Sequence, residues 1–152
     1  MTNRRPLAIP ILILVLAAAC GGQRDLQRHA AAATFAHDVA VASRAAVLEQ
    51  LEADVAAAVA GVADQGERDR RVAAIRARYT APGGPVELAN AVNRIGLAYV
   101  RAVLVAEQRD RPVWSKAAPL LGDALAIYAE LRKVVGDRLR PVPAVVAGMV
   151  SP

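Results

Sequence analysis

Apolar residues recur at helical spacing along most of this chain. Between residues 25 and 62 there is no proline, and the first glycine is Gly61. Apolar residues separated by three, four or seven positions fall on one face of a helix. At a rise of 1.5 Å per residue, a helix over 25–62 would be about 57 Å long, which favours the spine of a bundle or a coiled coil. The apolar stripe of this helix is Val41, Leu48, Leu51, Val55, Val59 and Val62.

The next stretch, "GVADQGERDR" (61–70), combines two glycines with dense charge. It suits either a turn or an exposed part of one continuous helix, because apolar spacing resumes after it and leads to Tyr79. We expect the first helix to continue through this stretch, with a weak point between Gly61 and Gly66. A break at Gly61 would instead add a separate helix.

A clear interruption follows at "TAPGGPVEL" (80–88), where two prolines and two glycines stand together. These residues cannot continue a helix, whereas Pro85 suits the first turn of the next one. Helical spacing resumes as far as Gln108 and again from about Pro112. No strand-like alternation occurs. The pattern therefore predicts an all-α fold, an antiparallel bundle of three helices with a long first helix, or of four helices if the first breaks at Gly61.

The bundle is expected to occupy residues 25–138, and the end of the chain differs from it. Residues 139–152 include three prolines and carry no charge after Arg140. Proline removes a backbone donor and fixes its own backbone angle, so it disfavours a regular helix. We predict an extended C-terminal tail over 139–152.

The beginning of the chain has the layout of a secretory signal. Arg4 and Arg5 form a basic start, and an apolar stretch of 13 residues runs from Leu7 to Ala19 and ends in three alanines. A positive head, a short apolar run and small residues are the three parts of a signal peptide. Thirteen apolar residues are too few to span a bilayer, which takes about 20. Residues 1–19 are therefore predicted to be a signal peptide.

The sequence "LAAAC" ends at Cys20, the single cysteine. It resembles the lipobox of bacterial lipoproteins, although Ala17 stands where that family favours leucine. The resemblance implies cleavage between Ala19 and Cys20, a lipid anchor such as palmitate-containing acyl chains on Cys20, and a short tether over 20–24. In such lipoproteins, an aspartate directly after the lipidated cysteine retains the protein in the inner membrane. This chain has Gly21 at that position, so the resemblance implies attachment to the outer membrane, with the protein facing the periplasm. An ordinary signal peptide and a short uncleaved anchor are the two alternatives.

Charge and composition exclude some functions. Because Arg4 and Arg5 leave with the signal peptide, the net charge falls from +5 to +3. Basic residues are interleaved with acidic ones over 65–78, and the five aromatic residues are scattered. A surface for nucleic acid needs an unopposed basic stripe, often with aromatic side chains on which bases stack. We therefore expect no nucleic-acid partner.

No arrangement of side chains indicates an active site. His29 and His37 are eight residues apart, too far along one helix to share a metal ion. Asp38 follows His37 directly, and neighbouring side chains on a helix diverge by about 100°. The serines lie outside any nucleophile motif, and 81–85 lacks the lysine of a phosphate loop. We expect no catalysis, no metal, no cofactor and no small-molecule substrate.

The sequence thus favours a lipid-anchored protein of the cell envelope that acts as a structural or protein-interaction module. Its partner would be another envelope protein or a second copy of the chain. The alternative is a phage-type outer-membrane lysis lipoprotein, similar to the outer partner of a spanin pair. We predict the partner contact on the first helix. The predicted contact residues are Leu48, Leu51, Val55 and Val59, and a second, polar candidate surface on the following helix comprises Asn90, Asn93, Arg94 and Arg101.

Overall fold

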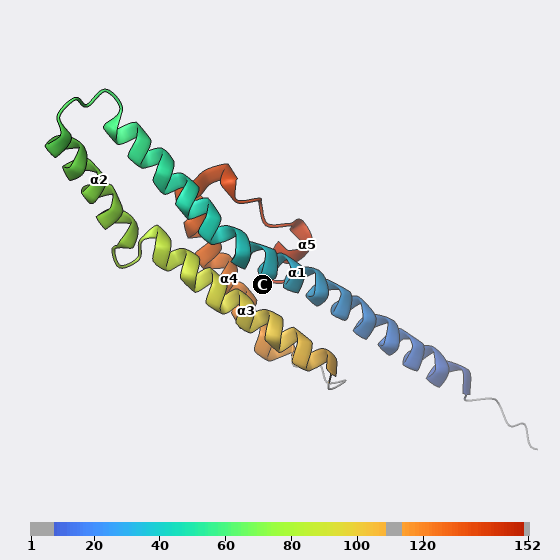
Figure 1. The fold of residues 1–152 in the computed structure, drawn as a ribbon. Helices are drawn as coiled ribbons and strands as arrows, with labels where there is room; N and C mark the ends of the chain where they lie inside the picture. Colours follow the sequence, from blue (N-terminus) through green and yellow to red (C-terminus); the bar gives the residue numbers. More distant parts are fainter. Residues whose placement is uncertain (1–7, 109–113, 151–152) are drawn as a thin grey trace, which may run out of the picture.

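The computed structural model describes the backbone of residues 8–108 and 114–150 and the side chains of 27–105 and 117–150. Within these residues all regular secondary structure is helical, and four helices pack together, which confirms the predicted all-α bundle (Figure 1). The elements in chain order are α1 (Ala8–Val59), α2 (Gln65–Thr80), α3 (Pro85–Gln108), α4 (Trp114–Val135), the short 3₁₀ helix η1 (Gly136–Arg138) and α5 (Ala144–Ala147).

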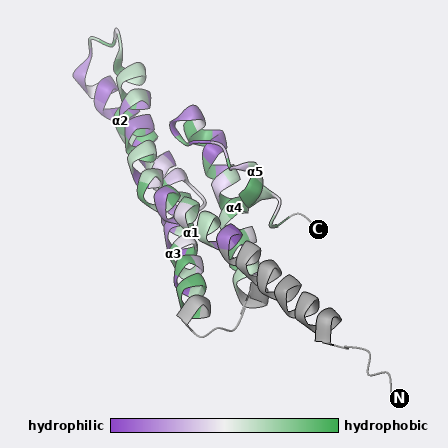
Figure 2. Ribbon diagram, turned by 90° about the vertical axis from the view of Figure 1, so that its right-hand side faces the viewer, coloured by the Kyte–Doolittle hydropathy of each residue, from purple (hydrophilic) through white to green (hydrophobic). Residues whose placement is uncertain are grey.

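The first helix ends at Val59, so the predicted continuation through residues 61–66 is wrong. Gly61 adopts a positive φ of 72°, which favours glycine and turns the chain. Asp64 then caps α2, because its side chain accepts a hydrogen bond of 2.7 Å from the backbone N–H of Glu67. The capped turn sends α2 back along α1 as an antiparallel hairpin, and α2 is largely hydrophilic (Figure 2).

The predicted break before Pro85 is confirmed. Gly83 has a positive φ of 73°, and its N–H donates to Glu87 Oε2 at 2.7 Å. Pro85 then opens α3, as expected from a residue whose missing N–H would have no partner in a first turn. After this break α3 continues along α1 in the same direction as α2, and it packs on both α1 and α4 (Figure 1).

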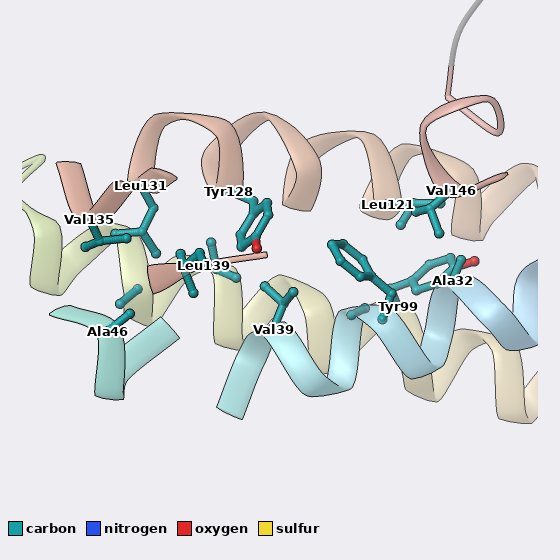
Figure 3. Close-up of a cluster of buried hydrophobic side chains, with 14 of the residues drawn as sticks. Ala32, Val39, Ala46, Tyr99, Leu121, Tyr128, Leu131, Val135, Leu139 and Val146 are labelled. Carbon is teal, nitrogen blue, oxygen red and sulfur yellow. The ribbon is translucent and has the colours of Figure 1, made fainter. Parts of the chain in front are cut away.

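Helices α1 and α3 approach each other closely at Gly96. A side-chain carbon built there would lie 3.2 Å from the carbonyl oxygen of Ala36, so a larger residue would push the helices apart. The absence of a side chain at this position thus permits the close approach of the two helices. The core includes three of the largest fully buried side chains, Tyr79, Tyr99 and Tyr128. Figure 3 shows Tyr99 and Tyr128 among alanine, valine and leucine side chains.

The end of the chain corrects the predicted extended tail. After η1, residues 139–150 fold back on the bundle and form the short helix α5. Leu139 and Val146 are each 1% exposed and join the core, with Leu139 lying between α4 and α1 (Figure 3). The Tyr128 hydroxyl donates to the carbonyl of Arg140 at 2.6 Å, and Arg132 Nε donates to that of Leu139 at 3.0 Å. The prolines leave backbone carbonyls available for these side chains, and two apolar residues anchor the segment.

The beginning of α1 also differs from the prediction. The helix runs without a break from Ala8, so residues 20–24, predicted to be a short tether, are helical. Alanine-rich sequence on the N-terminal side of the two glycines favours the helix there. At 52 residues, α1 is about 78 Å long, and its N-terminal part extends past the ends of α3 and α4 (Figure 1).

Candidate partner surface

The predicted contact stripe on α1 is divided between the interior and the surface. Leu51 packs against the core cluster, and Val55 and Val59 are half-buried in the part of α1 that α2 covers. Leu48, in contrast, is 57% exposed. Three of the four residues are therefore at least partly covered within the chain, and of the four Leu48 alone is largely exposed.

A polar network holds α2 against α1 at this position. The Asp54 carboxylate accepts from the Tyr79 hydroxyl at 2.8 Å and from the Arg78 guanidinium at 2.6 Å, both through Oδ2. Its Oδ1 accepts from Gln50 at 2.8 Å, and Gln50 in turn accepts from Arg138 of η1. The bond from Tyr79 lowers the pKa of Asp54, and burial raises the pKa of Tyr79 to about 12. The network thus joins three elements through one ionised carboxylate.

Removing this carboxylate should destabilise the bundle. We expect Asp54→Ala to lower the free energy of unfolding by about 1.5–3 kcal/mol, because hydrogen bonds to a charged group are lost and the buried Tyr79 hydroxyl loses its acceptor. Urea denaturation followed by circular dichroism measures the effect. Glu52→Ala, at an exposed acid on the same helix, should change the stability by no more than about 0.5 kcal/mol.

The loss should also depend on pH. The folded-state pKa of Asp54 lies below the ordinary value of 3.8, so its contribution is complete above pH 3.8 and disappears as the pH falls through the folded-state pKa. The stability difference between the wild type and Asp54→Ala should therefore shrink below pH 3.8. A difference that stays constant down to pH 2 would show that the ionised carboxylate does not stabilise the hairpin.

The open surface lies between α1 and α3. A cavity of about 160 Å³ is lined there by side chains of both helices. Arg44 crosses it and donates to Asn90 Oδ1 through Nε at 3.2 Å and Nη2 at 2.9 Å. Because Arg44 lies on α1 and Asn90 on α3, this contact identifies the side of each helix that faces the cavity. The residues that line the cavity are Arg44, Val47, Leu48, Val86, Ala89 and Asn90.

Helical periodicity extends this surface beyond the cavity. On α3, residues four positions before Asn90 and seven, eleven and fourteen after it lie within about 40° of it. Leu104 is 50% exposed, and Val41 on α1 is 67% exposed. We call this surface the α1/α3 face. Its residues are His37, Val41, Arg44 and Leu48 on α1, and Val86, Asn90, Leu97, Arg101 and Leu104 on α3.

The α1/α3 face carries unbalanced positive charge. Among the described residues, no carboxylate lies within 4.0 Å of Arg44, of Arg101, or of Arg94 at the edge of the face. Between Pro85 and Val105, the part of α3 whose side chains the structure describes, Glu87 is the single acid, and its carboxylate accepts from a backbone N–H. On α1, Asp38 pairs with Arg140 at 2.8 Å, on the side that meets the C-terminal segment. The predicted polar surface of α3 is therefore cationic and borders exposed apolar side chains.

The apolar composition of α3 matches this partial exposure. Within the described residues, one stretch, Gln65–Val105, contains an 18-residue window with a mean hydropathy of 1.2, long and apolar enough to cross a membrane. Only 28% of the window is buried. The core helix of a soluble protein passes the same test, so the window by itself does not indicate a membrane span.

The other candidate residues are separated in space. His29 is buried and its Nδ1 lies 2.8 Å from the Tyr99 hydroxyl, whereas His37 is exposed on the α1/α3 face. Burial raises the pKa of Tyr99 to about 12. Among the side chains that the structure describes, no three His, Cys, Asp or Glu residues form a group able to hold a metal ion. Ala19 and Cys20 lie on α1, and their side chains are outside the described residues.

Sequence reasoning missed the Asp54 network and the apolar half of the α1/α3 face. Asp54 was one acid among several on α1, and only the hairpin brings Tyr79 to it. The pairing of Arg44 with Asn90 joins residues 46 positions apart and depends on the register of two helices. Comparison with protein-family models, with curated proteins and with solved structures finds no match to the chain.

Proposed function

We propose that this protein is a lipid-anchored component of the cell envelope whose helical bundle acts as a protein-interaction module without catalysis. Cys20 would carry the lipid after cleavage behind Ala19, and the bundle would face the periplasm from the outer membrane. The basis for the anchor is the resemblance of "LAAAC" to a lipobox.

The course of α1 is compatible with this attachment. The helix continues from Cys20 into the core without a turn, and His29, the first buried residue described on it, contacts Tyr99 of α3. Nine residues of helix correspond to about 14 Å. A lipid on Cys20 would therefore hold the end of the bundle that contains the C-terminus of α3 close to the bilayer surface. The turn between α1 and α2, at the opposite end, would point away from the membrane.

The observation that carries the proposed interaction is the α1/α3 face. Leu48 and Val41 are more than half exposed beside an apolar cavity, although the same bundle buries three tyrosines completely. Large exposed apolar residues gathered on one surface mark an interaction site more often than scattered single residues do. The module would thus bind its partner, another envelope protein or a second copy, through this face.

Site-specific photo-crosslinking in intact cells tests the proposal. A benzophenone amino acid at position 48 should give discrete crosslinked products, whereas the same group at Val134, a 41% exposed residue of α4, should give none. The products should disappear in the Cys20→Ala background, because the unanchored chain would leave the membrane where its partner is. Equal products from positions 48 and 134 would contradict an interaction at the α1/α3 face.

A further inference from the structure

We propose that the α1/α3 face binds an amphipathic helix of an envelope protein that carries acidic residues beside its apolar stripe. This inference rests on the proposed interaction function and specifies the chemistry of the partner. The occupant is inferred from the shape, spacing and charge of the face, each of which follows from described residues.

The shape suits a helix. Two packed helices leave a shallow groove between their side chains, and between antiparallel α1 and α3 the cavity of about 160 Å³ at Leu48 and Val86 provides a recess in it about the size of one large side chain. An amphipathic helix binds such a groove by inserting apolar residues from one of its faces. The bound helix would lie along α1 and α3, on the side that α4 leaves uncovered.

The spacing of the apolar residues on this face matches this geometry, with Val41, Leu48 and Leu104 exposed and Leu97 half-buried. Val41 and Leu48 are seven residues apart on α1, as are Leu97 and Leu104 on α3. Seven residues of helix span about 10.5 Å. A helix with apolar residues at intervals of three, four and seven would therefore meet both pairs along two turns of its length.

The charge selects the partner. Arg44, Arg94 and Arg101 border the groove without a carboxylate partner among the described residues. The Asn90 side chain accepts from the Arg44 guanidinium across the opening of the cavity. The N–H groups of Arg44 that do not bond to Asn90 are available to another acceptor. Glutamate or aspartate beside the apolar stripe of a bound helix would supply that acceptor, and charge complementarity of this kind determines which partner binds.

The same charges disfavour a second copy of the chain. A two-fold dimer places the same surface on both sides of the contact. Arginines of one α1/α3 face would then meet arginines of the other, without a carboxylate on the described part of the face to separate them. Like charges at an interface oppose association. A separate acidic partner is therefore the better fit.

Two synthetic peptides test the proposal against the full acylated chain in nanodiscs of neutral phospholipid. Both are alanine-based amphipathic helices with the same leucine stripe, and one is flanked by glutamate and the other by lysine. Fluorescence anisotropy, with empty nanodiscs as the blank, measures their affinities. We expect the glutamate peptide to bind at least about tenfold more tightly, the effect of two or three exposed ion pairs.

Variants test whether the preference for the glutamate peptide comes from the α1/α3 face. Arg44→Glu combined with Arg101→Glu should reverse it in favour of the lysine peptide, and Arg76→Glu, at an exposed arginine of α2, should leave it unchanged. Leu48→Asp should weaken both peptides, and Leu48→Ala repeats that test if the aspartate variant loses helicity. Equal affinities of the two peptides, or a preference that the double variant retains, would overturn the proposal. The assay does not involve partner capture in cells, so its failure is distinguishable from failure of the crosslinking experiment.

Discussion

Truncation of Tyr128 to alanine should lower the free energy of unfolding by about 3–5 kcal/mol, the cost typical of removing a buried aromatic ring. Tyr128 is 1% exposed, and its ring meets that of Phe35 edge-on at 5.8 Å between centroids. Its hydroxyl holds the carbonyl of Arg140, while the Arg140 guanidinium lies 5.0 Å from the Phe35 ring and pairs with Asp38. One side chain thus connects α1, α4 and the C-terminal segment.

Tyr128→Phe is the matched control for this truncation. It keeps the ring and removes only the hydrogen bond to Arg140, so it should lower the free energy of unfolding by about 1 kcal/mol. Urea denaturation measures both variants, and limited proteolysis should show residues 139–150 cleaved faster in Tyr128→Ala. A loss below 1 kcal/mol in Tyr128→Ala would contradict the assignment of Tyr128 to the centre of the core.

Replacement of Cys20 by alanine should abolish both the lipid label and membrane association. Each buried methylene contributes about 0.8 kcal/mol to membrane binding, so several acyl chains attach a protein almost irreversibly. The alanine variant has no thiol to acylate, and the apolar stretch that precedes it is too short to span a bilayer. Labelled-palmitate incorporation and membrane fractionation of the same cultures measure the two losses.

Gly21→Ala is the control for this variant, because it changes the neighbouring residue and keeps the thiol. We expect it to retain both the label and the membrane association. A wild-type chain that takes no label would show that Cys20 is incidental, and the chain would then be a free secreted protein or one held by its uncleaved signal. The interaction proposed for the α1/α3 face would lose its membrane location but not its structural basis.

The helical class of the fold could be predicted because its signal is local. Apolar residues at intervals of three and four, with prolines and glycines between the segments, define α3 and the second half of α1. Continuation of the first helix was favoured over a turn after Val59, although the sequence contains a signal for the turn, an aspartate at 64 followed three residues later by Glu67. That capping pattern indicates the start of a helix more specifically than the two glycines indicate a weak point.

The tail and the surface could not be predicted because they depend on distant residues. Prolines indicated an extended segment, but Leu139 and Val146 have a buried place only because α4 and α1 leave room between them. The apolar stripe of α1 was assigned to one face without knowledge that α2 covers its second half. The Arg44–Asn90 contact likewise requires a particular register of α1 against α3, and residues 46 positions apart in the sequence do not reveal it.

The intact mass of the chain purified from membranes tests the central claim most directly. The account predicts a mature chain that begins at Cys20, with the added mass of a diacylglyceryl group on its sulfur and one further acyl group if the new amino terminus is modified. Fragmentation should place the added mass on the first residue. An unmodified chain, or one that still carries residues 1–19, would contradict the proposal of a lipid-anchored bundle.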